Sequence, residues 1–255
     1  MADFLDILAR DSKMSCESGY YRMVPAGLKL RKSRVSLRDN IEERSNNAII
    51  SEIKRASPSR GAIRKEADIR GITSAMERGG AAGVSILTEP SHFNGSLRDF
   101  ILARESVSLP MLMKDIIVDG SQIEAAQSMG ADAVLLIKAI FDRGYADRSL
   151  EVMIDQAHSR NLEVLLEVHT GEEFSDAMSL GADLVGINNR DLKTLKVDLH
   201  VTEGILSGRK NWAATVVSES GIESQADLLF LRRTGAKAFL IGTSIMSAEN
   251  VEKKV

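Results

Sequence analysis

Several apolar, strand-like stretches of the chain carry ionisable residues that could do chemistry. The stretches Ile49–Lys54 (IISEIK), Met111–Asp115 (MLMKD) and Leu165–His169 (LLEVH) are hydrophobic except for glutamate, lysine, aspartate or histidine side chains. A lysine or carboxylate removed from water costs several kcal/mol or shifts its pKa unless it is paired. Repetition of this arrangement on separate strands therefore suggests a functional site.

The ionisable groups have the types needed for acid and base chemistry. Glu52 and Lys54 are two residues apart, so both side chains lie on the same face of an extended strand. Partly desolvated lysines and carboxylates can donate and accept protons in a reaction. Further candidates follow or end the other apolar stretches: Glu89, Lys114, Glu167, Asn188, Arg190, Glu219 and Ser220.

The elements that position these residues alternate between β-rich and helical patterns. About eight β-rich stretches begin near Ile49, Gly83, Met111, Ala133, Leu162, Asp183, Ala214 and Ala238. Between most of them lie segments with helical spacing, such as 121–129, 149–160 and 224–234. A glycine followed by alanine recurs before the strands, at 80–81, 130–131, 181–182 and 235–236, where glycine can cap a helix in the left-handed conformation. This repetition is typical of βα units.

The pattern predicts an α/β protein with a (β/α)8 TIM barrel and an N-terminal helical extension. Strands this apolar on both faces indicate a parallel sheet, and eight βα units close into a barrel. An open doubly wound sheet is the alternative, but Lys54–Gly61 reads KRASPSRG and lacks the GxGxxG turn of that fold. We expect the barrel to span residues 48–255. Residues 1–47, with helices near 4–10 and 37–45, would cover the barrel mouth.

Composition excludes several functional classes. The 255 residues are 44% hydrophobic and 27% charged, and the net charge is −3, so nothing favours a nucleic acid or an anionic membrane surface as partner. Cys16 is the single cysteine, which excludes an intramolecular disulfide and a cysteine metal cluster. The N-terminal segment resembles neither a signal peptide nor a membrane span. We expect a cytoplasmic protein and a monomer, with association with other enzymes left as an alternative.

The candidate residues lie in seven short motifs along the chain: 51–59 (SEIKRASPS), 87–89 (LTE), 93–96 (FNGS), 113–115 (MKD), 166–168 (LEV), 186–192 (GINNRDL) and 218–222 (SESGI). In sequence and in order, these motifs closely resemble those of one enzyme family, indole-3-glycerol-phosphate synthase. The resemblance implies a (β/α)8 barrel and a carboxy-lyase of tryptophan biosynthesis. Its phosphorylated small-molecule substrate, 1-(2-carboxyphenylamino)-1-deoxyribulose 5-phosphate, loses CO2 and water without a metal or organic cofactor.

The resemblance also implies roles for the ionisable residues. Lys114 is the expected general acid for the ketone oxygen, and Lys54 is suited to hold the carboxylate that leaves as CO2. Glu167 is the expected base, with Glu52 as a second acid or base, or as a support for the lysines. Asn188 and Ser220 would bind substrate hydroxyls, and Arg190 and Glu219 would orient their neighbours. Glu89, Phe93, Arg190 and Leu192 complete the expected substrate-binding set.

A phosphate group needs a different environment, which barrels often provide in the loops after the seventh and eighth strands. These loops contain Gly221, Gly242 and Thr243, where glycine lets the backbone approach an anion and threonine can donate a hydroxyl. Ser57 is a further phosphate contact implied by the resemblance. Ile116 stands where the family commonly has phenylalanine, so Phe93 and Leu192 should compensate in the ring pocket.

His169 is next to Glu167, and neighbouring residues on a strand point to opposite faces. We therefore expect His169 to face the helical layer and not the site.

Two functional alternatives remain: a barrel similar to phosphoribosylanthranilate isomerase, and a non-catalytic barrel that binds a phosphorylated metabolite. The first does not explain two lysines with several carboxylates, and the second does not require them.

Overall fold

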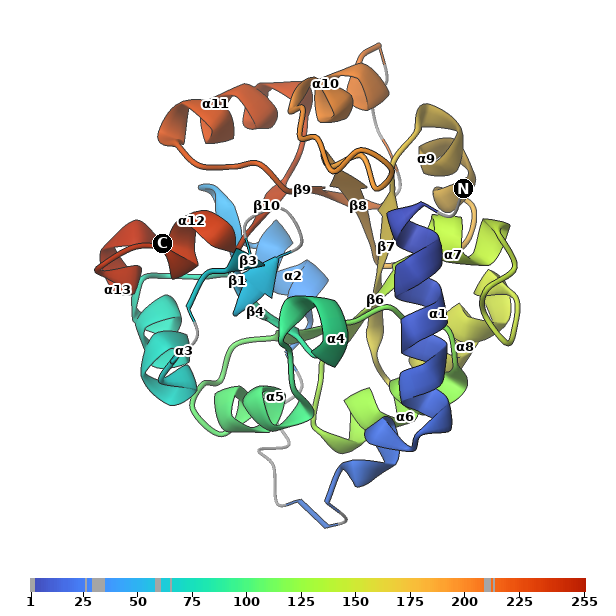
Figure 1. Ribbon diagram of the computed structural model, residues 1–255. Helices are drawn as coiled ribbons and strands as arrows, with labels where there is room; N and C mark the ends of the chain where they lie inside the picture. The colour runs from blue at the N-terminus through green and yellow to red at the C-terminus, as the bar shows by residue number, and fades with distance from the viewer. Residues whose placement is uncertain are drawn as a thin grey trace.

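The computed structural model describes residues 3–25, 27–28, 35–57, 61–64, 66–208, 212 and 214–255. Within these residues, eight parallel strands form a closed barrel in which successive barrel strands pair and the last strand pairs with the first (Figure 1). The strands are β1 (Ala48–Ile53), β4 (Gly83–Leu87), β5 (Met111–Lys114), β6 (Ala133–Ile137), β7 (Glu163–Val168), β8 (Leu184–Asn188), β9 (Thr215–Glu219) and β10 (Ala238–Ile241). The predicted (β/α)8 barrel is confirmed, and the alternative of an open sheet is wrong.

Helices connect and surround the strands. They are α3 (Ile69–Arg78), α4 (Pro90–Phe93), α5 (Leu97–Arg104), α6 (Gly120–Ser128), α7 (Lys138–Asp142), α8 (Leu150–Ser159), α9 (Gly171–Ala177), α10 (His200–Leu206), α11 (Gln225–Thr234), α12 (Thr243–Met246) and α13 (Val251–Lys254). Side chains of Asp119, Ser149 and Ser224 accept backbone hydrogen bonds at the starts of α6, α8 and α11, as expected of capping residues. The expected left-handed glycines occur at Gly80, Gly130, Gly181 and Gly235.

Alternation of side chains along the strands produces two apolar cores. Ile50, Leu112 and Leu165 belong to the core inside the barrel, whereas Ile49 and Met113 belong to the core between the barrel and its helices. The inner core is mainly aliphatic, whereas the outer core also contains buried phenylalanine and methionine side chains. The same alternation directs the polar side chains at the strand ends, such as Glu52 and Glu167, into the mouth of the barrel.

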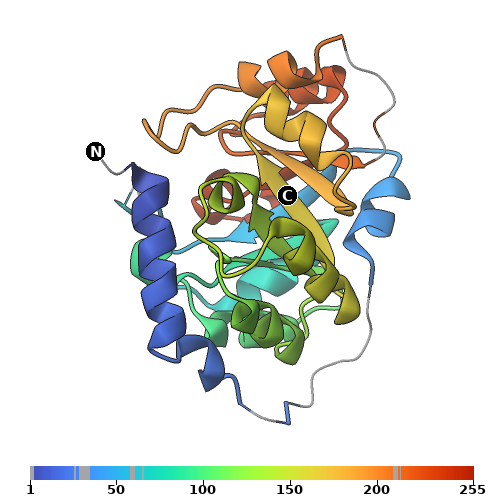
Figure 2. The same cartoon turned by 90° about the vertical axis from the view of Figure 1, so that its right-hand side faces the viewer.

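The N-terminal extension contributes α1 (Phe4–Glu17), the 3₁₀ helix η1 (Tyr20–Met23) and α2 (Leu37–Glu42). Helix α1 borders the barrel mouth, whereas α2 lies at the opposite end, so the two helices are on opposite sides of the molecule in Figure 2. The Asn40 side chain donates to the carbonyl of Ala82 (2.6 Å), and the Leu37 backbone N–H donates to Glu163 (2.6 Å) at the start of β7. A domain boundary at residue 47 stays a prediction.

A short antiparallel hairpin follows β1. It consists of β2 (Ala56–Ser57) and β3 (Gly61–Ala62), and its turn lies outside the described residues, as do parts of the extension and the end of the 51–59 motif. Among the described residues, no helix is long and apolar enough to cross a membrane.

Candidate active site

A cavity of about 490 Å³ opens at the C-terminal ends of the barrel strands. Every residue that the sequence placed in the site lines this cavity: Glu52, Lys54, Ser57, Glu89, Phe93, Lys114, Glu167, Asn188, Arg190, Leu192, Glu219, Ser220, Gly221, Gly242 and Thr243. Parallel barrel strands end at one rim, which is why residues far apart in the sequence converge there.

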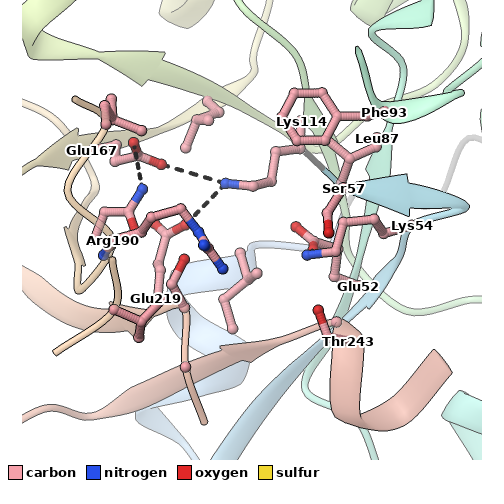
Figure 3. Close-up of a pocket in the computed structure, with 18 of the residues that line it drawn as sticks. Glu52, Lys54, Ser57, Leu87, Phe93, Lys114, Glu167, Arg190, Glu219 and Thr243 are labelled. Atoms are coloured by element: carbon pink, nitrogen blue, oxygen red, sulfur yellow. Dashed lines mark hydrogen bonds and ion pairs between the residues drawn. The ribbon is translucent and has the colours of Figure 1, made fainter. Parts of the chain in front are cut away.

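Lys114 is held between two buried carboxylates (Figure 3). Its Nζ lies 3.0 Å from Glu219 Oε2 and 3.4 Å from Glu167 Oε2. Burial alone would lower the pKa of Lys114, but the carboxylates of Glu219, Glu167 and Glu52 outweigh burial and raise it above its usual value. Lys114 therefore enters the cavity as an ammonium group that can donate a proton.

The two carboxylates beside Lys114 differ in their proton affinity. Burial would raise the pKa of Glu167, yet Lys114, His169 and the Asn188 amide lower it below its usual value. Asn188 Nδ2 donates to Glu167 Oε1 at 3.0 Å. Burial raises the pKa of Glu219, and the negative charge of Glu167 adds to this effect. Of the two carboxylates, Glu167 is therefore the one whose surroundings favour the ionised form.

A second ion pair lies across the cavity from Glu167 and Glu219 (Figure 3). Lys54 Nζ is 2.7 Å from Glu52 Oε1, as expected for residues on one strand face. A Cβ atom at position 242 would collide with Glu52 Oε1, so a larger residue there would displace this carboxylate or the loop after β10. The loop backbone and the Glu52–Lys54 pair are therefore in direct contact.

The remaining polar end of the cavity is formed by loop backbone and hydroxyl groups. Ser220 and Gly221 have φ angles of +68° and +83°, so two successive residues after β9 are in the left-handed region. Thr243 begins α12, and the Ser57 hydroxyl is buried without a hydrogen-bond partner in the described residues. These groups form the part of the cavity best suited to an anion.

Apolar side chains form the rest of the cavity wall. Phe93, Ile116 and Leu192 lie there together, as does Arg190, whose guanidinium donates to the Leu195 carbonyl at 2.8 Å. Glu89 lines the cavity, but its carboxylate accepts the backbone N–H groups of residues 91, 92 and 93 at the start of α4. Glu89 thus fixes the loop that carries Phe93.

Sequence reasoning missed two sets of residues. Phe4 and Leu8 of α1 line the cavity, and their spacing of four residues marks the apolar face of a helix. His169 faces Glu173 of α9 and does not line the cavity, as expected, but its ring Nε2 also lies 3.4 Å from Glu167 Oε1, a contact that strand alternation did not predict. Strand β7 ends at Val168, so strand alternation does not extend to His169, whose backbone N–H donates instead to Glu173 of α9 at 2.6 Å.

Comparisons with known proteins agree with the geometry. The profile of the family described as indole-3-glycerol phosphate synthase matches residues 11–255. Proteins of that name from Methanocaldococcus jannaschii and Neisseria meningitidis are 44% and 43% identical over 89% and 82% of this chain, covering 83% and 78% of their own lengths. One from Bacillus cereus is 37% identical over 98% of this chain and 96% of its own length.

Solved structures with lower sequence identity share the fold. A thiamine phosphate pyrophosphorylase from Pyrococcus furiosus has a TM-score of 0.60 at 21% identity, covering 86% of this chain and 94% of its own. An N-acetylmannosamine-6-phosphate 2-epimerase from Clostridium perfringens has a TM-score of 0.60 at 16% identity, covering 84% and 92%. At these identities the similarity extends to the fold alone.

Proposed function

The chain belongs to the indole-3-glycerol phosphate synthase family, and we propose that it acts as a carboxy-lyase through the residues of its barrel mouth. The proposed reaction converts 1-(2-carboxyphenylamino)-1-deoxyribulose 5-phosphate into indole-3-glycerol phosphate, CO2 and water. The observation that carries the assignment of roles is the Lys114 ammonium group, which two buried carboxylates hold at the cavity.

Ring closure is the first step of the proposed mechanism. The aromatic carbon that bears the carboxylate attacks the ketone carbon, a carbon–carbon bond forms, and the ketone oxygen takes a proton from Lys114. The raised pKa of Lys114, maintained against burial by Glu219 and Glu167, keeps this proton available at neutral pH. Lys114 lies across the cavity from the Glu52–Lys54 pair, which supports binding of the substrate between them.

Loss of CO2 follows ring closure. The bond to the carboxylate carbon breaks, and its electron pair neutralises the cation formed in the ring. Lys54 is suited to position the carboxylate before it leaves, because its ammonium group is at the cavity and Glu52 Oε1 holds it at 2.7 Å. The carboxylates around the cavity stabilise the cation until CO2 departs.

Dehydration completes the aromatic indole. A carbon-bound proton goes to a carboxylate, and the hydroxyl group formed from the ketone leaves as water with a second proton. We assign the base to Glu167 because its lowered pKa keeps it ionised, and the second acid to Lys54, with Glu52 as the alternative. Asn188 and Ser220 are proposed to bind substrate hydroxyls, and Arg190 and Glu219 to orient their neighbours.

Substrate binding is divided between two parts of the cavity. We propose that Ser57, Gly221, Gly242 and Thr243 bind the phosphate, since these residues present hydroxyls and closely approaching backbone. Phe93, Leu192 and Ile116 are proposed to pack on the aromatic ring, with Phe4 and Leu8 of α1 closing the wall.

One assay tests the function. Purified protein is mixed with the carboxyphenylamino substrate in the presence of a metal chelator, and indole fluorescence and CO2 are followed together. The proposal expects one CO2 for each indole product. A protein that binds this substrate but releases no CO2 would overturn it, and turnover of phosphoribosylanthranilate alone would favour an isomerase.

A further inference from the structure

His169 lies between two carboxylates without hydrogen-bonding to either through its ring. Nε2 faces Glu167 Oε1 at 3.4 Å, and Nδ1 faces Glu173 Oε2 at 3.7 Å. Both ring nitrogens are buried, and neither has a hydrogen-bond partner among the described residues. A neutral imidazole would leave one nitrogen as a lone-pair acceptor pointed at a carboxylate, which is a repulsive arrangement. A protonated imidazole presents an N–H to each.

The charges around the mouth also favour a cation at this position. Glu52, Glu167 and Glu219 are at most 2% exposed. Lys54 pairs with Glu52, but Lys114 is shared by Glu167 and Glu219. Glu167 therefore has only part of one lysine to compensate its charge, and buried carboxylates require such compensation to remain ionised.

The groups that face His169 are predominantly acidic. They are Glu167 on β7, Glu173 on α9 and, at longer range, Glu219 on β9, while the nearest cations act on its partners: Lys114 on Glu167 and Lys138 on Glu173. Burial alone would lower the pKa of His169, but Glu173 and Glu167 outweigh it and raise the pKa above its usual value. The acidic neighbours thus stabilise the protonated ring.

We propose that His169 is a positioning residue which, as an imidazolium bridging Glu167 and Glu173, holds Glu167 in place and ionised. The inference rests on the proposed function in that Glu167 is the base. His169 does not touch the substrate, since it is not among the residues that line the cavity. The charge of His169 acts on the site through Glu167. Glu173 of α9 holds His169 in place by accepting a hydrogen bond from its backbone N–H.

The pH profile of turnover tests the charge of His169. His169→Gln keeps a side-chain N–H donor but removes the charge, so the pKa of Glu167 should rise by about one unit, the lower end of the effect of a nearby opposite charge. The acidic limb of kcat/KM should move to higher pH by the same amount, and the ratio of wild type to variant should approach about tenfold at low pH. At high pH, kcat and KM should both approach wild-type values.

His200→Gln is the matched control. His200 Nδ1 pairs with Glu203 at 2.8 Å on an exposed helix face, so its loss removes a similar histidine–glutamate pair whose residues do not line the cavity. Its profile should coincide with that of the wild type. If the His169→Gln profile coincides with both, His169 does not sustain the ionisation of Glu167 and the proposal fails.

A titration by NMR of the imidazole protons decides the same question without turnover and with little risk to folding. His169 should titrate above its usual value of 6.5 in the wild type. Glu173→Gln, at a half-buried position, should lower that pKa because one facing carboxylate is lost. Titration of His169 at or below 6.5 in the wild type contradicts the proposal. An inactive wild type with a raised His169 pKa would instead refute the proposed function while supporting the bridge.

Discussion

At the scale of single residues, Glu167 and Glu219 have different surroundings, and this difference decides which of the two carboxylates binds a proton more readily. Both carboxylates contact Lys114, but Glu167 also accepts a hydrogen bond from Asn188 and faces His169. Glu219 Oε1 is buried without a partner in the described residues, and a Cβ at position 186 would collide with it, so a larger residue there would displace the Glu219 carboxylate. The environment therefore favours ionisation of Glu167 more strongly than that of Glu219, and Glu219 is the first of the two to take up a proton as the pH falls.

The two glutamine variants test this asymmetry. Glu167→Gln removes the base, so kcat should fall by roughly 10²–10⁴-fold, the usual contribution of such a group. Glu219→Gln resembles the protonated form of that residue and should reduce kcat much less, with little change in stability. Steady-state kinetics at pH 7 compare the two, and a larger loss in Glu219→Gln would reverse the assignment of the base.

The sequence predicted which polar side chains at the strand ends share a face, but it did not predict the surroundings of His169. Alternation placed Glu52 and Lys54 on one face, and the structure joins them at 2.7 Å. The same rule did not predict the contact of His169 with Glu167, because β7 ends one residue earlier and the backbone turns toward α9. The sequence shows an apolar stretch but not the residue at which pairing stops, and a difference of one residue reverses the direction of a side chain.

At the scale of elements, η1 of the extension is tied to the strand that carries Lys114. The Tyr21 hydroxyl donates to Asp115 Oδ1 at 2.9 Å, and Asp115 also accepts from Thr88 and the Ile116 backbone. Burial raises the pKa of Asp115 to about 7, despite these donors. The Tyr21–Asp115 hydrogen bond thus joins η1 to a buried carboxyl group next to Lys114.

Tyr21→Phe should destabilise the protein in a pH-dependent way. The folded pKa of Asp115 is already above its usual 3.8, and loss of a donor to the carboxylate raises it further. The cost should be about 1–3 kcal/mol at pH 8.5, where the wild-type carboxylate is ionised, and should diminish below pH 7, where Asp115 is protonated in both proteins. Urea unfolding at pH 5.5 and 8.5 measures it.

Tyr20→Phe is the control for this effect. The Tyr20 hydroxyl donates to the Thr88 carbonyl at 3.1 Å and accepts from the Leu97 backbone at 3.2 Å, so no carboxylate receives its proton. Its cost should be the same at both pH values. An equal and pH-independent cost in the two variants would contradict the raised pKa of Asp115.

The loop between β10 and α12 offers a second element-scale prediction. Gly242→Ala would place a Cβ against Glu52 and displace the carboxylate, the loop or both, so kcat/KM should fall by roughly 10²-fold, the effect of a misplacement of about 1 Å. Gly204→Ala in α10 meets no atom and should only gain about 0.5–1 kcal/mol of stability. Steady-state kinetics and urea unfolding of the two variants measure these effects. A near-normal kcat/KM in Gly242→Ala would contradict a close contact between Gly242 and Glu52.

The positions of helices α1 and α2 on the barrel could not be predicted from their sequence patterns. Phe4 and Leu8 of α1, and Leu37 and Ile41 of α2, have the same spacing and form similar apolar faces. One pair borders the mouth, while the other packs at the opposite end, where Gly83 leaves room for Leu37. The spacing identifies an amphipathic helix but does not specify which apolar end of a barrel it covers.

At the scale of the whole molecule, the barrel was predictable because its signals repeat. Each predicted apolar stretch corresponds to one barrel strand. The left-handed glycines that precede several of these strands follow the ends of helices. The family match confirms the principal functional hypothesis, and neither alternative is favoured. The closed topology brings Lys54, Lys114 and Glu167 to one cavity from three strands or their ends, so the proposed chemistry depends on the complete barrel.

A single-turnover experiment with Lys114→Met tests this account most directly. Methionine keeps the length and apolar stem of lysine but cannot donate the proton to the ketone oxygen. With enzyme in excess over the carboxyphenylamino substrate, the account predicts that indole fluorescence appears roughly 10²–10⁴-fold more slowly than in the wild type, while substrate binding remains measurable. Formation of indole by Lys114→Met at the wild-type rate would contradict the account.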